Sequence, residues 1–330
     1  MDVVLTGAEG ALGRRVTAGL RATGHEVVAV SSQHEGGLEP AAVVVDLGSS
    51  DHDRRAARRQ SATETTAATL AVADRAGAQH VVFVSSAMVY GAAANNPVPL
   101  TEDATLRPEV DFVFARQLAS SEELVEQWRR RGSCRTTTVL RPAVALAADG
   151  VSRLATALVN GLGRRLAEAD PPAQFLHLDD LASAVVLAVD RRLDGVYNVA
   201  PDGWVAGERV RALSGERPRL PLPERVGDLV AGLRWRFQRG PIPPGLLAYT
   251  REPWVVSNDR LRAEGWEPTV TNEQTYVEGT DAPWWTVVSP KRRQELALGA
   301  AVAGAVLAAI VGVVLGRRRL SRRASAARRR

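Results

Sequence analysis

The first 24 residues constrain the fold of this 330-residue chain more than any other segment. A short apolar run, Asp2 to Thr6, precedes the glycine-rich stretch GAEGALG, and residues 14–23 are typical of a helix that ends at Gly24. In a strand–turn–helix unit of this kind, the first glycine permits the tight turn and the second lets the backbone approach a pyrophosphate. The third lets the helix pack on the strand. We therefore predict a dinucleotide-binding fold whose cofactor contacts are Gly7, Gly10 and Gly13.

The end of the second strand bears on which dinucleotide binds. An apolar run at residues 26–30 is followed by Ser31 and Ser32. An Asp or Glu at this point would bind the ribose hydroxyls of NAD, whereas a serine suits the phosphate of NADP. We expect Ser31 to contact the cofactor, with a slight preference for NADP and with NAD as the alternative.

Later motifs sharpen the assignment. They are VVFVSSAMVYG at residues 81–91, TVLRP at 138–142, FLHLDDLA at 175–182 and GVYNVA at 195–200. With the Thr6-Gly7 turn, they resemble the extended short-chain dehydrogenase/reductases, the NAD-dependent epimerase/dehydratase family, over about residues 1–280. The resemblance implies an α/β fold, a Rossmann-like doubly wound parallel sheet with a smaller split substrate lobe. It also implies a small-molecule ligand such as a sugar nucleotide.

The same resemblance sets the expected domains. Residues 1–200 form the NAD(P)-binding domain, from which residues 143–174 leave as an excursion into the second lobe. Residues 201–285 form the C-terminal substrate lobe. Residues 286–330 hold a membrane helix and an arginine-rich tail.

The catalytic residues that the family implies are incomplete. The family uses a tyrosine as the proton donor or acceptor, a lysine four residues later that lowers the tyrosine pKa, and a serine that holds the substrate oxygen. Ser86 matches the serine, but the best register puts Val113 and Gln117 at the other two positions. Sliding by one residue gives Phe112 and Arg116, which could keep a ribose contact but cannot relay a proton. The chain has no tyrosine between Tyr90 and Tyr197, and its only lysine is Lys291. We therefore predict a degenerate active site.

Three residues remain as candidates for the chemistry. Ser86 and Tyr90 are the hydroxyl groups that we place at the catalytic centre, since each offers a proton near the end of a predicted strand. Arg141 lies where family members contact their substrate, and an arginine that pins a loop is the alternative. Cys134 is solitary and the histidines have no ligand spacing, so we expect no metal site.

The third strand leads to a second departure from the family. Residues 42–45 precede Asp46-Leu47, which resembles the family's adenine-contacting Asp-Leu and gives two further candidate cofactor contacts. Residues 48–60 are polar, and no apolar fourth strand precedes the helix expected at 62–77. The pattern predicts that a central strand is missing and that cofactor affinity is reduced or absent. In the alternative, the neighbouring strands close the gap.

The charge distribution disfavours a nucleic-acid partner. The total charge is +5, but residues 291–330 hold eleven basic residues and one glutamate, a net +10, which leaves −5 for residues 1–290. Nucleic-acid binding requires cations on a folded surface. The basic charge is instead concentrated beside a hydrophobic segment.

That segment, residues 296–315, is twenty residues long and uncharged. A helix of this length matches a hydrocarbon core of about 30 Å. We predict a membrane helix in contact with lipid, with a buried core helix as the alternative. Its small-x-x-x-small spacing permits helix pairing and hence a homo-oligomer. Because the first strand begins at residue 2, we expect a cytoplasmic globular domain; the tail would then be either translocated or re-entrant.

Three functional hypotheses remain open. The first is a membrane-anchored NAD(P)-binding protein with weak or absent family catalysis. The second is an active NAD(P)-dependent oxidoreductase or epimerase on a sugar nucleotide or related substrate. The third is a non-enzymatic membrane interaction module.

Overall fold

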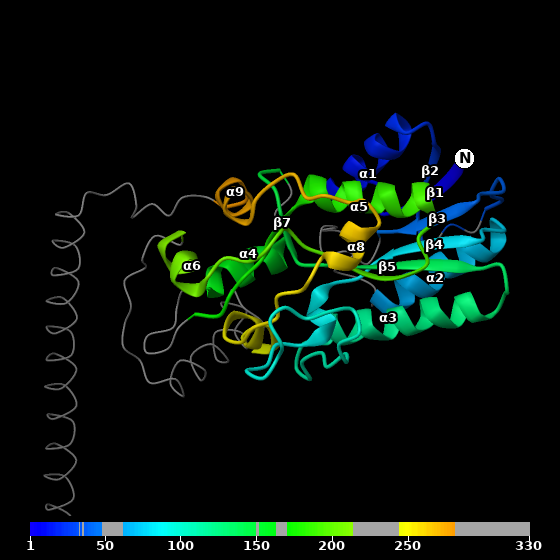
Figure 1. Cartoon of the computed structure of the whole chain (residues 1–330). Coiled ribbons are helices and arrows are strands. Elements are labelled where there is room, and N and C mark those ends of the chain that lie inside the picture. Colours follow the sequence, from blue (N-terminus) through cyan, green and yellow to red (C-terminus); the bar gives the residue numbers. More distant parts are fainter. Residues whose placement is uncertain are drawn as a thin grey trace, which may run out of the picture. The chain divides into compact units, whose positions relative to one another are not determined.

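The computed structural model describes residues 1–32, 34, 36–47, 62–149, 152–162, 170–213 and 244–280 (Figure 1). The chain divides into two compact units, Met1–Asp281 and Ala282–Arg330. All described residues belong to the first unit.

A parallel sheet of six strands forms the centre of this unit. Its strands are valine-rich because a parallel sheet is covered on both faces. The sheet confirms the predicted Rossmann-like α/β fold. In spatial order the strands are β2 (Glu26–Val30), β1 (Asp2–Thr6), β3 (Val43–Asp46), β4 (His80–Val84), β5 (Thr136–Pro142) and β8 (Gly195–Val199).

Two pairs of helices cover the sheet, one pair on each face (Figure 1). Helices α1 (Ala11–Ala22) and α5 (Leu178–Arg191) pack on one face, and α2 (Ala62–Arg75) and α3 (Val113–Arg130) pack on the other. Alternate strand residues point to opposite faces, so Val3 and Leu5 of β1 join one hydrophobic cluster while Val4 joins the other.

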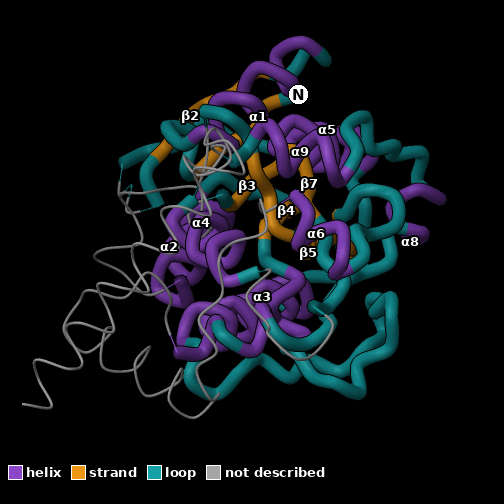
Figure 2. The backbone as a smooth tube through the Cα atoms, turned by 90° about the vertical axis from the view of Figure 1, so that its left-hand side faces the viewer, coloured by secondary structure: helices purple, strands orange, loops and turns teal. Residues whose placement is uncertain are grey.

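A smaller lobe lies beyond the carboxyl ends of the strands (Figures 1 and 2). Directly after β5 the chain enters β6 (Val144–Leu146), which pairs in parallel with β7 (Phe175–His177). The lobe's helices are α4 (Arg153–Gly161), α6 (Gly207–Leu213) and α9 (Asn272–Glu278). The short helix α8 (Asp259–Ala263) contacts β8, and 3₁₀ turns form η2 (Ala87–Tyr90), η3 (Pro244–Leu246) and η4 (Ala248–Thr250).

The prediction of a missing central strand is wrong. Strand β3 pairs with β1 on one side and with β4 on the other, so the centre of the sheet is continuous. In the usual doubly wound sheet the strands, numbered along the chain, lie in the spatial order 3-2-1-4-5-6. The first strand therefore has the second strand on one side and the fourth on the other. Residues 43–46 therefore take the fourth position. Within the described residues β2 is an edge strand, and the unfilled position is the one outside it.

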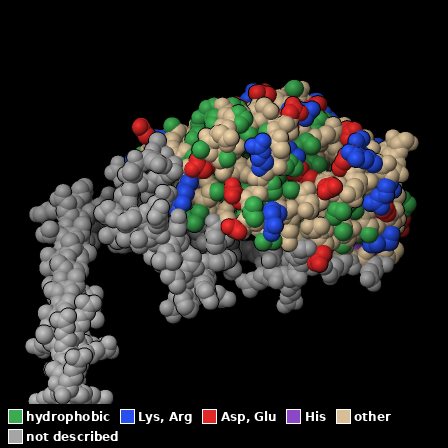
Figure 3. All heavy atoms as spheres, turned by 90° about the horizontal axis from the view of Figure 1, so that it is seen from below, with side chains coloured by type: hydrophobic (Ala, Val, Ile, Leu, Met, Phe, Trp, Pro, Cys, Tyr) green, Lys and Arg blue, Asp and Glu red, His purple; other side chains and the backbone are tan. Residues whose placement is uncertain are grey.

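Figure 3 shows a face of the molecule on which basic and acidic side chains are interspersed. The described part of this face has no continuous basic surface of the kind that tracks a phosphate backbone.

Among the described residues, no helix combines the length and the apolar character needed to cross a bilayer. The membrane helix predicted at residues 296–315 lies outside the described residues.

Candidate functional site

The glycine turn joins β1 to α1, and its geometry explains two of its glycines. Gly7 has φ of +77°, a left-handed conformation that favours glycine. A Cβ atom on Gly13 would lie 2.2 Å from the carbonyl oxygen of Gly7, so only a glycine lets the helix approach the strand this closely. Gly10 precedes the helix with an extended backbone, and its N–H donates to Gly7 O over 3.3 Å.

The N-terminus of α1 is arranged to receive an anion. Its first turn has no acidic residue, and none of the described side chains caps it. Free N–H groups at a helix N-terminus, together with the helix dipole, bind phosphate groups. The turn therefore fits a pyrophosphate. Ser31 is exposed directly after β2. In this fold the adenosine ribose of a dinucleotide would lie at this point.

Asp46 and Leu47 lie on the other side of β1 from the position implied by the family resemblance. Asp46 pairs in register with Thr6, accepts a hydrogen bond from the Thr6 hydroxyl over 3.1 Å, and is buried. Leu47 N donates to Thr6 O over 3.2 Å. Because β3 takes the fourth position, both residues follow a strand of the second mononucleotide half, not of the adenine half. Whether they contact a dinucleotide stays a prediction.

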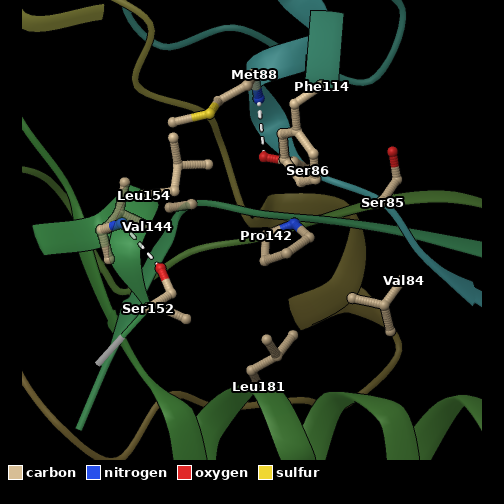
Figure 4. A pocket seen from close by; sticks show the side chains of 13 residues that line it. Val84, Ser85, Ser86, Met88, Phe114, Pro142, Val144, Ser152, Leu154 and Leu181 are labelled. Atoms are coloured by element: carbon tan, nitrogen blue, oxygen red, sulfur yellow. Dashed lines mark hydrogen bonds between the residues drawn. The ribbon is translucent and has the colours of Figure 1, made fainter. Parts of the chain in front are cut away.

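A pocket lies between the end of β4, the start of α3 and the smaller lobe (Figure 4). Its described lining is apolar apart from three serines, and no charged side chain lines it. The lining residues are Val84, Ser85, Ser86, Met88, Phe114, Pro142, Ala143, Val144, Ala145, Ser152, Leu154, Ala155 and Leu181.

The structure places Ser86 in this pocket. Its hydroxyl oxygen accepts a hydrogen bond from Met88 N over 3.2 Å and so caps η2. The side chain is half-buried and lines the pocket. This placement agrees with a role in holding a substrate oxygen.

The aromatic residue that shares the pocket with Ser86 is Phe114 (Figure 4). Val113, at the tyrosine position in the predicted register, is 52% exposed and does not line the pocket. Gln117 is also directed elsewhere, because its side-chain oxygen accepts from Ala62 N at the start of α2 over 3.3 Å. The residue of α3 that lines the pocket is Phe114, one position after Val113, whereas Phe112 and Arg116 of the alternative register do not line it. Leu118 stands four residues after Phe114 and is buried. Neither Phe114 nor Leu118 offers a hydroxyl or a cation.

Tyr90 and Arg141 do not line the pocket but belong to a buried network. The Tyr90 hydroxyl donates to Asn198 Oδ1 over 2.8 Å and accepts from Arg141 Nη1 over 2.7 Å. Arg141 Nη2 donates to Glu122 over 2.6 Å, and the Ser85 hydroxyl donates to the same carboxylate over 2.5 Å. These contacts favour the alternative in which Arg141 pins the structure.

Burial sets the protonation of this network. It raises the pKa of Tyr90, and the nearby Arg141 offsets only part of that rise. Burial also acts to lower the pKa of Arg141, but hydrogen bonding and attraction to Glu122 leave the value above its ordinary level. A phenol with a raised pKa is a poor proton relay near neutrality.

Sequence reasoning missed Phe114, Glu122 and Asn198. Glu122 lies eight residues after Phe114 on α3, and its burial and its pairing with Arg141 are visible only in the structure. Asn198 interrupts the apolar strand β8, and its backbone N donates to Glu102 over 2.9 Å.

Arg15 connects the glycine-turn helix to the smaller lobe. Its guanidinium donates to Asp149 over 2.6 Å and to Asp179 at the start of α5. The hydrogen bond from Arg15 holds the pKa of Asp149 below its ordinary value. These pairs are largely exposed and orient the loop after β6 more than they stabilise the fold.

The doubly wound sheet and the glycine turn define a Rossmann-like fold of the kind found in dinucleotide-binding proteins, and the pocket lies between the sheet and a smaller lobe. The profile of the NAD dependent epimerase/dehydratase family matches residues 3–200. The chain belongs to this family.

Curated relatives are distant. An uncharacterised protein of Mycobacterium tuberculosis is 25% identical over 199 residues, which are 60% of this chain and 53% of that protein. The chain therefore spans about half the length of such mycobacterial relatives. A 3-diazoavenalumate denitrifying reductase of a Streptomyces species is 28% identical over 313 residues, covering 82% of this chain and 96% of the reductase.

Solved structures share the fold. A UDP-glucose 4-epimerase of Thermus thermophilus in complex with NAD matches with a TM-score of 0.59 and 17% identity, over 84% of this chain and 97% of the epimerase. A human epimerase family protein with NADPH matches with a TM-score of 0.60 and 20% identity, over 84% and 99% of the two chains.

Proposed function

We propose that the chain is an NAD(P)-binding epimerase/dehydratase-family protein in which the tyrosine–lysine proton relay is weak or absent. One observation carries the proposal. The aromatic residue beside Ser86 in the pocket is Phe114, and four residues later stands Leu118, which is 1% exposed. The glycine turn keeps the geometry that a pyrophosphate requires.

In this proposal different residues contact the cofactor and the substrate. The N–H groups at the start of α1 hold the pyrophosphate, and Ser31 faces the adenosine ribose, where its hydroxyl suits the phosphate of NADP. The Ser86 hydroxyl donates to a substrate oxygen. When bound, the nicotinamide supplies or accepts a hydride. Since the described lining of the pocket offers neither a phenol nor a cation, Ser86 or solvent takes the proton transfer in this proposal.

Titration of the full chain with NAD, NADH, NADP and NADPH tests this proposal. We expect saturable binding and no epimerase or dehydratase turnover at rates typical of the family. Gly10→Val provides the site control, since its side chain would occupy the space of the pyrophosphate. Absence of binding to any of the four dinucleotides would favour the non-enzymatic interaction module. Unchanged affinity in folded Gly10→Val would place the ligand elsewhere.

A second candidate is an active NAD(P)-dependent reductase. It is favoured by the match to the Streptomyces protein named as a reductase, which extends over 96% of that protein. A substrate that accepts the hydride without a proton from a side chain would need no tyrosine–lysine pair, and the Ser86 hydroxyl would only hold it by a hydrogen bond. Turnover of NADPH with such an electrophilic substrate, weakened by Ser86→Ala and abolished by Gly10→Val, would establish this activity.

We also propose that residues 296–315 anchor the protein in a membrane and that the globular part faces the cytoplasm. The support is the uncharged length of the segment and the basic residues on both sides of it. Pairing of such helices through their small residues would give a homo-oligomer.

A further inference from the structure

The described lining of the pocket gives it an unusual character for a family whose solved members include enzymes of sugar nucleotides. Ten of its thirteen lining residues are apolar. Of the three serines, Ser85 is 5% exposed and donates its proton to Glu122, and Ser152 is 1% exposed and caps α4 by accepting from Ala155 N. Ser86 is the remaining hydroxyl, and its side chain is directed into the cavity (Figure 4).

Among the described residues, two arginines of this half of the molecule form ion pairs within the fold. Arg141 is engaged with Glu122, and in the lobe Arg211 pairs with Asp170 over 3.0 Å. A nucleotide diphosphate carries two or more negative charges and is normally held by arginines in bidentate contact. The described lining offers it no such partner.

We propose that this pocket binds an uncharged, mainly apolar molecule with one hydrogen-bond acceptor oxygen, such as an aryl ketone or aldehyde, and not a sugar nucleotide. The acceptor oxygen lies against Ser86, and the hydrocarbon part contacts Phe114, Val144, Leu154 and Leu181. The proposal rests on the proposed function in taking the pocket as the substrate side of the dinucleotide site.

One substitution in the pocket lining tests whether the ligand is apolar. Leu154 is half-buried, lines the pocket and is the second residue of α4. Leu154→Glu would place an anion against an apolar ligand, yet an acidic residue in the first turn of a helix is compatible with its dipole. The matched control is Thr156→Glu, because Thr156 is exposed on the same helix and does not line the pocket.

The test uses the full chain in detergent, with 2-acetylnaphthalene as the aryl ketone and UDP-glucose as the sugar nucleotide. Binding is followed by saturation-transfer NMR, and detergent at equal concentration without protein gives the background from micelles. We expect Leu154→Glu to weaken ketone binding at least tenfold and Thr156→Glu to leave it unchanged. Ser86→Ala should weaken it about 2- to 10-fold, the effect of one neutral hydrogen bond.

Each outcome decides a different point. If UDP-glucose displaces the ketone, or if neither Leu154→Glu nor Ser86→Ala changes ketone binding, the inference about the ligand class is wrong. The dinucleotides are titrated separately on the same samples. Ketone binding without dinucleotide binding would leave this inference standing and overturn the proposed function, whereas dinucleotide binding without ketone binding would do the reverse.

Discussion

Arg141 and Glu122 form an ion pair over 2.6 Å in the interior, with side chains that are 6% and 8% exposed. The pair joins β5 to α3, directly behind the pocket residue Ser85. Two buried charges in this geometry are costly to separate, because a charge left alone in the interior loses both its solvation and its partner. Arg141, which the family resemblance places beside the substrate, thus forms an ion pair in the protein interior.

We expect Glu122→Gln to lower the free energy of unfolding by about 3–5 kcal/mol, since it leaves the Arg141 guanidinium without a charged partner. Chemical denaturation measures the loss. The double variant Glu122→Leu with Arg141→Met should lose less than the sum of the two single variants, because it removes both charges. Strictly additive losses would show that the two residues do not act as a pair.

Because Phe114 lines the pocket and Val113 does not, substituting a tyrosine at each position should give different results. Phe114→Tyr puts a phenol beside Ser86, whereas Val113→Tyr puts one on an exposed surface. Without a lysine nearby the phenol keeps a pKa near 10, so its gain should be well below the ~10²–10⁴-fold of an assisted acid. NADPH oxidation by an aryl ketone measures the rate. We expect an increase only for Phe114→Tyr.

One result would contradict the prediction for Phe114. If the unmodified chain shows turnover at rates typical of the family, and Tyr90→Phe abolishes that turnover, the proton relay lies at η2. We expect Tyr90→Phe to leave ligand binding unchanged and to reduce stability by about 1 kcal/mol, through loss of its hydrogen bonds to Asn198 and Arg141.

The local signals of the sequence predicted the fold well. The glycine turn and the valine-rich strands indicate their own structure, because a tight turn and a sheet buried on both faces each restrict composition directly. The strand at 43–46 was also recognisable. The position of this strand in the sheet was not predictable. The connection from β2 crosses to the far side of β1 before β3 begins, and nothing in residues 31–42 indicates that crossing.

The site was only partly predictable for a related reason. Ser86 follows a strand and caps a 3₁₀ turn, both local features. Which side of α3 faces the pocket depends on packing, and a shift of one residue turns a helix by about 100°. That rotation separates exposed Val113 from Phe114. Similarly, a strand alternates its side chains, so the orientation of Arg141 away from the pocket required the structure.

The glycine turn gives a prediction about binding without loss of fold. Gly10 has φ of −69° and ψ of 167°, which any residue can adopt, so Gly10→Val should fold normally and lose most dinucleotide affinity. Gly13→Ala should instead destabilise the protein, because its Cβ would lie 2.2 Å from Gly7 O. Calorimetric titration and thermal unfolding of both variants separate the two effects. Equal loss of stability in both would contradict this division.

His80 should make stability depend on pH. Burial lowers its pKa from 6.5 to about 4 in the folded protein, where its ring nitrogens meet the hydroxyls of Thr136 and Thr138. As the pH falls from 6.5 to 4 the unfolded chain binds the extra proton, so stability falls, by about 3 kcal/mol at most, and this contribution is constant above 6.5. Denaturation across this range should show the slope, and His80→Gln should remove it. His25→Gln, a partly exposed control, should retain it.

Membrane fractionation tests the proposed anchor at residues 296–315. The full chain should remain with membranes after washes in high salt and in alkaline carbonate, since an embedded helix is held by apolar contact. Attachment through the arginines alone would be released by 1 M salt, where the Debye length is about 3 Å. Complete release by salt would contradict the embedded helix.

The unfilled position outside β2 has a consequence for how the protein must be handled. Within the described residues this strand pairs only with β1, and Val28 at its centre is 48% exposed. The opposite edge, β8, is contacted by α8 and by Arg260, which donates to Val196 O over 3.3 Å. An uncovered strand edge is a template on which a second chain can add. When the protein is overproduced or partly unfolded, β2 is where misassembly should begin, and Val28→Lys should raise solubility without changing the glycine turn.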